Sequence, residues 1–122
     1  MESLIPIAIA VLFIAFIYTR LAPVKGLRTL GSAEFKKQLN QHPKKALIDV
    51  REPGEFRAGS IRGAVNIPLS QLGARWSEIP RDQSVYLFCQ SGVRSRQAAR
   101  VLSKHGFTDL THLQGGYISW EH

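Results

Sequence analysis

The chain has 122 residues, enough for one domain with a modest core. Its formal charge of +7 comes without the interleaved basic and aromatic side chains typical of RNA-binding surfaces, so we expect no nucleic-acid partner. The single cysteine excludes an internal disulfide, and the four histidines lack metal-ligand spacing, so the sequence predicts no metal and no cofactor.

The chain begins with an apolar segment. Residues 4–19 carry no charged side chain and would form about 24 Å of helix, somewhat less than a bilayer core of about 30 Å. Hydropathy is even around this helix, which favours a spanning helix over an interfacial one. The segment lacks the basic start of a signal peptide. Cleavage after Ala22 would place Arg20 at the −3 position and Pro23 just past the cut, and both are poor choices there. These features favour a signal-anchor over a cleaved signal peptide. We therefore predict a transmembrane helix over residues 1–21 that contacts the lipid bilayer through residues 4–19.

Basic residues follow this segment. Arg20, Lys25 and Arg28 lie on its carboxyl side, and positive charge marks the cytoplasmic end of a membrane helix. A lone thiol also survives better in the cytoplasm. We expect a single-pass protein of the cell membrane, with a linker over residues 22–26 and a cytoplasmic domain over residues 27–122.

Short apolar runs alternate with helix-like segments along the rest of the chain. Strands are predicted at residues 27–30, 46–50, 64–68, 84–88 and 107–113. Helices are predicted at residues 33–40, with Ser32 as N-cap, and at residues 69–76 and 96–104, while Arg-Glu-Pro-Gly at residues 51–54 predicts a loop. This alternation is typical of an α/β fold with a mainly parallel sheet covered by helices on both faces.

Cys89 lies at the end of the predicted strand 84–88, in a polar loop that leads into a helix. Ligands of parallel sheets gather at this end of the strands. Backbone N–H groups and the positive end of a helix dipole favour a thiolate, the nucleophilic form of cysteine. The local pattern leaves two interpretations: a nucleophile for covalent sulfur chemistry, or a buried structural cysteine.

Three motifs occur in a fixed order along the domain. They read LIDVREPGEF at residues 47–56, continued by GSIRGAVNIP at 59–68; CQSGVRS at 89–95; and LQGGYISW at 113–120. With these motifs the chain resembles the rhodanese family of sulfurtransferases over residues 27–120. The resemblance implies an α/β rhodanese-like fold with a five-stranded parallel sheet. It also implies the subclass of single rhodanese domains that an N-terminal helix tethers to a membrane.

The resemblance implies a sulfurtransferase whose nucleophile is Cys89. This residue would take a sulfane sulfur from a donor such as thiosulfate, hold it as a persulfide, and pass it to cyanide or a thiol, a protein acceptor included. The loop residues are expected to bind the substrate: Gln90, Ser91, Gly92, Val93, Arg94 and Ser95. Their backbone N–H groups would form a nest for anionic sulfur, with curvature at Gly92, and Arg94 would present a donor fork to an oxyanion.

Residues outside the loop are expected to support it or to modify its specificity. Asp49 is predicted to order the loop after its strand, and Arg51 to pair with it or with Glu52. Ser60 stands where the first motif often has histidine, for which we expect a minor structural effect. Gln90 stands where arginine is frequent, and the loss of that cation is expected to weaken the use of thiosulfate.

Two other functions compete with sulfur transfer. Phosphatases and arsenate reductases of the related fold place five residues between cysteine and arginine, whereas four separate Cys89 from Arg94. The smaller ring favours a sulfane sulfur over a tetrahedral phosphate. The second alternative is a non-catalytic, membrane-tethered binding module, and the presence of Cys89, Gly92 and Arg94 together argues against it.

Overall fold

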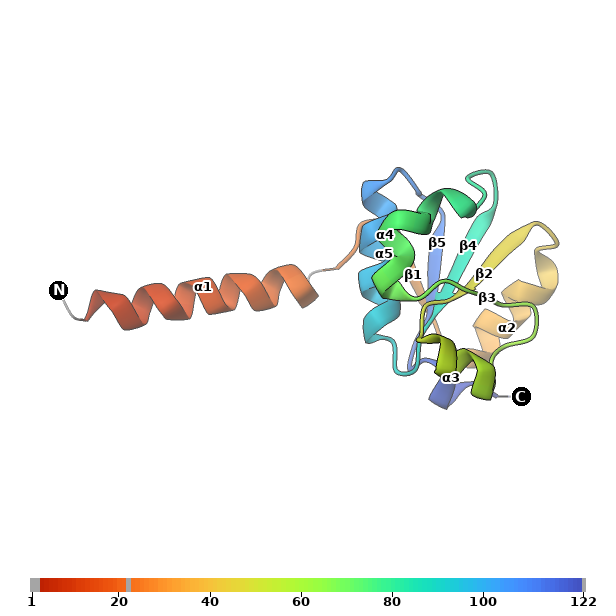
Figure 1. The fold of residues 1–122 in the computed structure, drawn as a ribbon, viewed down its shortest axis with the longest axis horizontal. Coiled ribbons are helices and arrows are strands. Elements are labelled where there is room, and N and C mark those ends of the chain that lie inside the picture. The colour runs from red at the N-terminus through yellow and green to blue at the C-terminus, as the bar shows by residue number, and fades with distance from the viewer. Residues whose placement is uncertain (1–2, 22, 122) are drawn as a thin grey trace.

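The computed structural model describes residues 3–21 and 23–121, except for the side chains of residues 20 and 21. The start of the predicted membrane segment, residue 22 of the predicted linker and residue 122 of the predicted domain lie outside the described residues. A helix, α1 (Leu4–Leu21), precedes a domain in which helices surround one sheet, as Figure 1 shows.

The sheet has five strands in the order β1-β5-β4-β2-β3, and every pair is parallel. Its strands are β1 (Leu27–Leu30), β2 (Lys45–Asp49), β3 (Val65–Asn66), β4 (Ser84–Phe88) and β5 (Leu110–Leu113). Because the strands are parallel, the residues that follow β2, β4 and β5 meet at one edge. The predicted α/β fold with a five-stranded parallel sheet is confirmed.

Helices cover both faces of the sheet, and side chains alternate between two cores. Val85 and Leu87 of β4 pack under α4 (Leu69–Arg75) and α5 (Val93–Lys104), whereas Tyr86 and Phe88 face α2 (Ser32–Gln41) and the turn η2 (Tyr117–Ser119). Figure 1 shows α4 and α5 on one side and α2 on the other. Each fully buried apolar side chain contributes roughly 1.5–3 kcal/mol. These cores hold β4 rigidly at the centre of the sheet.

Two helix starts differ from the sequence prediction. Gly31 is the N-cap of α2 in place of Ser32, whose hydroxyl instead accepts a hydrogen bond from the Glu121 N–H at 2.9 Å. Helix α5 begins at Val93, three residues before the predicted start, because Gly92 takes a left-handed conformation (φ +104°) that turns the loop at once into the helix. Half of the predicted loop therefore belongs to the first turn of α5.

A short helix, α3 (Pro53–Ala58), replaces the loop predicted after β2. Pro53 lies at its first position, and Glu52 and Glu55 form a reciprocal capping box. The remaining elements agree with the prediction within a few residues, although β3 and β5 are shorter than the strands predicted at 64–68 and 107–113. A turn of 3-10 helix, η1 (Trp76–Glu78), follows α4.

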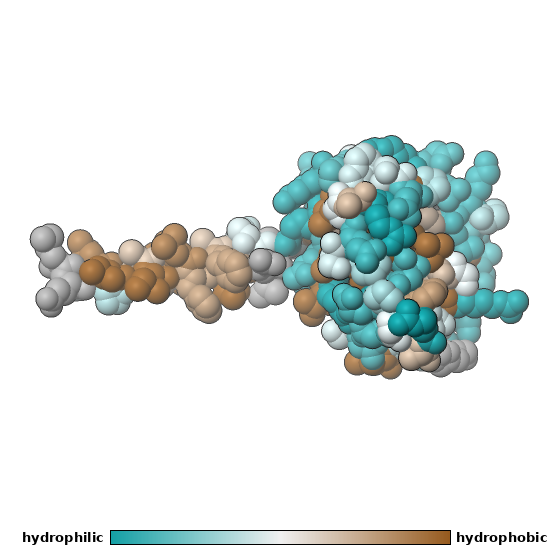
Figure 2. Space-filling view, viewed as in Figure 1, coloured by the Kyte–Doolittle hydropathy of each residue, from teal (hydrophilic) through white to brown (hydrophobic). Residues whose placement is uncertain are grey.

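Helix α1 exposes its large apolar side chains, and Figure 2 shows it as a hydrophobic rod beside a domain whose visible face is mostly hydrophilic. They are Leu4, Ile5, Ile7, Ile9, Val11, Leu12, Phe13, Ile14, Phe16, Ile17 and Tyr18. In the part of the chain that the structure describes, no helix is both long and apolar enough to cross a membrane. The predicted helix is present, whereas the transmembrane span predicted over residues 1–21 is not supported.

Candidate active site

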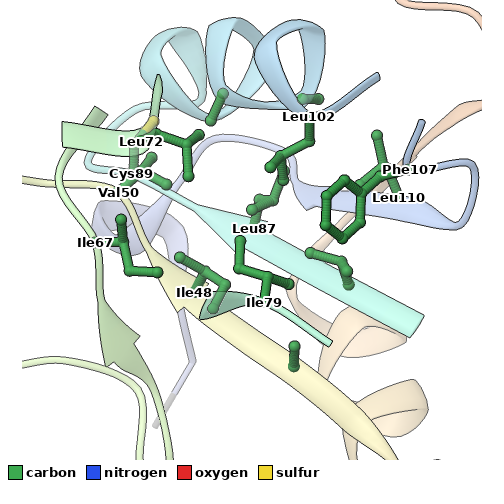
Figure 3. Close-up of a cluster of buried hydrophobic side chains, with 14 residues drawn as sticks. Ile48, Val50, Ile67, Leu72, Ile79, Leu87, Cys89, Leu102, Phe107 and Leu110 are labelled. Carbon is green, nitrogen blue, oxygen red and sulfur yellow. The ribbon is translucent and has the colours of Figure 1, made fainter. Parts of the chain in front are cut away.

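Cys89 directly follows β4, and its side chain is fully buried beside Val50 and Leu72 (Figure 3). The main-chain N–H of Gly92 donates a hydrogen bond to the Cys89 Sγ at 2.9 Å, and the Ser95 hydroxyl lies 3.6 Å from the same sulfur. The Gly92 N–H is one of the amides of the nest that is predicted from Gln90 to Ser95. Among the described residues, the main-chain hydrogen bond to sulfur comes from Gly92.

The other loop residues have different surroundings. The Gln90 side chain points to Arg51, while Ser91 and Val93 are exposed. A cavity of about 260 Å³ lies against the loop and is lined by Thr29, Ser91, Gly92, Val93, Arg96, His112, Gln114 and Gly115. This cavity offers a small molecule both polar groups and a cationic side chain next to the cysteine loop.

The third motif forms main-chain hydrogen bonds with the cysteine loop. The Tyr117 N–H donates to the Cys89 carbonyl at 2.8 Å, and the Ile118 N–H donates to the Gln90 carbonyl at 3.2 Å. Gly116 makes this approach possible, because a Cβ there would lie 2.4 Å from the carbonyl carbon and oxygen of Gln90. The first turn after β5 therefore fixes the backbone that carries the thiol.

Asp49 and Arg51 form the predicted pair, and both are buried. The Arg51 guanidinium donates to both carboxylate oxygens of Asp49, to the Gly59 carbonyl and, at 3.1 Å, to the Gln90 side chain. The Ser60 hydroxyl also donates to Asp49, at 2.8 Å. The network ties the first motif to the cysteine loop, so Ser60 contributes to the support of the site.

Arg94 forms an ion pair within the protein. Its two terminal nitrogens donate to the two carboxylate oxygens of Glu55 on α3, at 2.7 and 3.0 Å. The hydrogen bonds from Arg94 hold the pKa of the Glu55 carboxyl down to about 2. The donor fork that was predicted to meet a substrate oxyanion therefore already binds a carboxylate of the protein.

Removing the Glu55 charge is expected to free this fork for an anion. We predict that Glu55→Gln raises the rate at which iodoacetate alkylates Cys89, relative to neutral iodoacetamide, by roughly 3- to 10-fold, because a charge-assisted contact becomes available to the anionic reagent. The measurement is the ratio of the two alkylation rates. The control Glu78→Gln removes the same charge from the exposed pair with Arg75 and is expected to leave the ratio unchanged. An unchanged ratio in Glu55→Gln would disprove the competition.

His112 on β5 contacts the site through Ser95. The ring is buried, with Nδ1 at 2.9 Å from the Ser95 hydroxyl and Nε2 at 3.0 Å from the Thr29 hydroxyl. Burial lowers the pKa of the imidazole to about 4, and the Arg96 guanidinium adds to the effect. The ring is therefore neutral at neutral pH. Spacing along the sequence carried no signal for this residue, because its position depends on the pairing of β5 with β1 and β4.

The lowered pKa of His112 predicts a loss of stability in mild acid. The unfolded chain binds a proton at this ring below about pH 6.5, whereas the folded protein does so only near pH 4, so stability falls as the pH falls between these values. Between pH 7 and pH 4.5, the melting temperatures of wild type and of His112→Asn are both expected to fall. We expect the fall to be smaller in His112→Asn, by roughly 5–10 °C. The exposed-histidine variant His42→Asn is expected to keep the full drop, and equal drops in all three proteins would refute the assignment.

Fold and site together define an α/β domain that presents one cysteine in a tight loop at the carboxyl edge of a parallel sheet. The chain belongs to the rhodanese-like domain family, whose match covers residues 32–122. The membership of the rhodanese family that the three motifs predict is therefore confirmed, whereas the membrane-tethered subclass stays a prediction.

Similar proteins include both uncharacterised proteins and sulfurtransferases. The chain is 45% identical over 116 residues to the uncharacterised protein YqhL of Bacillus subtilis, with 92% of this chain and 90% of YqhL covered. It is 40% identical over 74 residues to a sulfurtransferase of Allochromatium vinosum, with 61% and 69% covered. The solved structure of the human single-domain sulfurtransferase TSTD1 is 32% identical, with a TM-score of 0.65 over 75% of this chain and 93% of TSTD1.

Proposed function

We propose that the protein is a rhodanese-type sulfurtransferase that carries sulfur as a persulfide on Cys89. The observation that carries the proposal is the hydrogen bond from the Gly92 N–H to the Cys89 sulfur at the start of α5, where a negative sulfur is stabilised. The descriptions of the Allochromatium protein and of TSTD1 as sulfurtransferases support the same chemistry.

The reaction proceeds in two displacements at sulfur. The Cys89 thiolate attacks the outer sulfur of thiosulfate, the S–S bond of the donor breaks, and sulfite leaves with the electron pair. The product is the Cys89 persulfide anion. Cyanide or a thiolate then attacks the terminal sulfur and leaves as thiocyanate or as a new persulfide, which returns the Cys89 thiolate. Charge balances in both steps, so no general base is needed.

Positive charge near the cysteine loop favours sulfur donors that are anions. Arg96 lines the cavity that lies against the cysteine loop, and the chain has a formal charge of +7. Gln90 adds no cation, and its amide is held by Arg51. We therefore propose thiosulfate as a working but weak donor, with a small thiol or a protein thiol as acceptor and cyanide as its laboratory substitute.

We also propose that α1 associates with the lipid bilayer and holds the domain at the cytoplasmic face of the cell membrane. The proposal rests on the exposed apolar side chains of α1 and on the basic residues that follow it. The full chain is expected to remain with washed membranes, whereas Leu12→Lys combined with Phe13→Lys releases it. Val65→Lys, an exposed position of the domain, is the control. Equal retention of all three proteins would contradict the proposal.

Turnover assays separate sulfur transfer from the alternatives. We expect the purified chain to convert thiosulfate and cyanide to sulfite and thiocyanate, and to leave an aryl phosphate and arsenate unchanged. Turnover of the phosphate ester or of arsenate would support a phosphatase or an arsenate reductase. The absence of turnover with thiosulfate, polysulfide and low-molecular-weight persulfides would support a non-catalytic binding module.

A further inference from the structure

A row of hydrogen-bonding side chains runs across the sheet to the reactive sulfur. From β1 it passes from Thr29 to His112 on β5, then to Ser95 in the first turn of α5, and ends at Cys89. The successive separations are 3.0, 2.9 and 3.6 Å. We call these four residues the β5 chain. Ser95, His112 and Cys89 are buried, so water does not compete with the two contacts that join them, whereas Thr29 is exposed at the outer end of the row.

The number of protons around Ser95 determines which groups donate and which accept the hydrogen bonds of the β5 chain. The Ser95 oxygen has three polar neighbours: the Cys89 sulfur, the Gly92 carbonyl at 3.1 Å and the His112 Nδ1. The carbonyl only accepts hydrogen bonds, and so does a thiolate. If Nδ1 were also without a proton, three acceptors would share one hydroxyl proton, and two of them would face an oxygen lone pair. An ionised Cys89 therefore requires the proton of the neutral imidazole on Nδ1.

This tautomer gives the β5 chain one direction. The Thr29 hydroxyl donates to Nε2, Nδ1–H donates to the Ser95 oxygen, and the Ser95 proton is left for the sulfur or the Gly92 carbonyl. A charged acceptor forms the stronger hydrogen bond, so the proton turns to the thiolate. The charged and titratable groups that face the ring are Cys89, through Ser95, and the Arg96 guanidinium from α5. Since the imidazole stays neutral, the β5 chain orients the Ser95 hydroxyl proton and does not remove a proton from Cys89.

We propose that His112 is a positioning residue that, through Ser95, directs a hydroxyl proton onto the Cys89 sulfur and so stabilises the thiolate. The inference rests on the proposed sulfur transfer, in which Cys89 leaves as a thiolate when the acceptor takes the terminal sulfur. A better stabilised thiolate is a better leaving group. The β5 chain therefore acts on the discharge of the persulfide as well as on the ionisation of the resting enzyme.

Two substitutions of His112 distinguish the roles of its two ring nitrogens. The side-chain amide of asparagine replaces Nδ1 and retains a donor for Ser95, whereas the longer glutamine places its amide at the position of Nε2 and retains only the contact with Thr29. The first measurement is the rate of Cys89 alkylation by iodoacetamide against pH, for wild type, His112→Asn, His112→Gln and Ser95→Ala in the full chain. We expect His112→Gln and Ser95→Ala to shift the midpoint upward by about one pH unit, a tenfold loss of thiolate, and His112→Asn to keep the wild-type midpoint.

The coupling between the residues is measured in the double variant. Ser95→Ala with His112→Gln is expected to show the shift of Ser95→Ala alone, because His112 acts through the serine. Nitrogen chemical shifts of labelled histidine provide an independent readout, with Nδ1 protonated in the thiolate form. Two additive shifts in the double variant, an equal midpoint for asparagine and glutamine, or a ring protonated on Nε2 would each overturn the proposal.

These results are independent of whether sulfur transfer occurs. Alkylation and histidine spectra need no sulfur donor, so they test the β5 chain even if wild type forms no persulfide. If wild type does transfer sulfur, cyanide is expected to discharge the persulfide of His112→Gln about tenfold more slowly than that of His112→Asn. Equal discharge rates would overturn the role of His112 and leave the proposed function standing.

Discussion

Cys89→Ser is expected to reduce thiocyanate formation from thiosulfate and cyanide by more than about 1000-fold. A hydroxyl ionises too weakly to act as the nucleophile near neutral pH and cannot accept a sulfane sulfur as a persulfide. The measurement is the steady-state rate at saturating cyanide, over a range of thiosulfate concentrations.

The serine variant also tests whether the loss is chemical. The hydroxyl nearly matches the thiol in shape, so the Gly92 N–H keeps an acceptor and the melting temperature is expected to stay within a few degrees of wild type. Residual turnover within tenfold of wild type, in a folded protein, would show that sulfur transfer does not pass through this residue.

Gly116→Ala is expected to reduce sulfur transfer by roughly 100-fold and to destabilise the domain by about 2–4 kcal/mol. Gly116 has φ +69°, and its missing side chain leaves room for the backbone of Gln90 and Ser91, which a Cβ would approach to 2.4–2.5 Å. The cysteine loop must shift, and with it the Gly92 N–H that contacts the sulfur. Turnover and urea unfolding of the same preparation measure the two effects.

Gly73→Ala provides a matched control for this substitution. Gly73 lies within α4, has nothing within 4 Å of an added Cβ, and is not among the positive-φ glycines. Alanine is expected to keep full activity there and to stabilise the helix by about 0.5–1 kcal/mol. If Gly116→Ala behaved like Gly73→Ala, the close approach of the third motif to the cysteine loop would not be needed for activity.

Much of the fold was predictable because its signals are local. Each buried strand is a short apolar run closed by turn residues, and β4 ends at the only cysteine. The pairing of Asp49 with Arg51 was predictable for the same reason, since the two residues lie two positions apart at the end of β2. Local pattern also placed Gly92 at the turn into α5, although the helix starts earlier than predicted.

What the sequence did not reveal depends on contacts between distant segments. Glu55 pairs with Arg94 across 39 positions, and the capping box and Pro53 were the only local signs of the helix that carries it. His112 reaches Ser95 only through the order of the strands. At α1, the apolar run predicted a span, whereas the described residues contain no helix that is long and apolar enough to cross a membrane.

The intact mass of the protein after incubation with thiosulfate, in the absence of reductant, shows whether Cys89 takes up a sulfur atom. Because Cys89 is the only cysteine, a gain of one sulfur atom can be assigned to it without peptide mapping. We predict that wild type gains this mass, loses it on addition of cyanide with one equivalent of thiocyanate released, and that Cys89→Ser gains nothing. An unchanged wild-type mass with thiosulfate, polysulfide and low-molecular-weight persulfides alike would show that Cys89 does not carry sulfur.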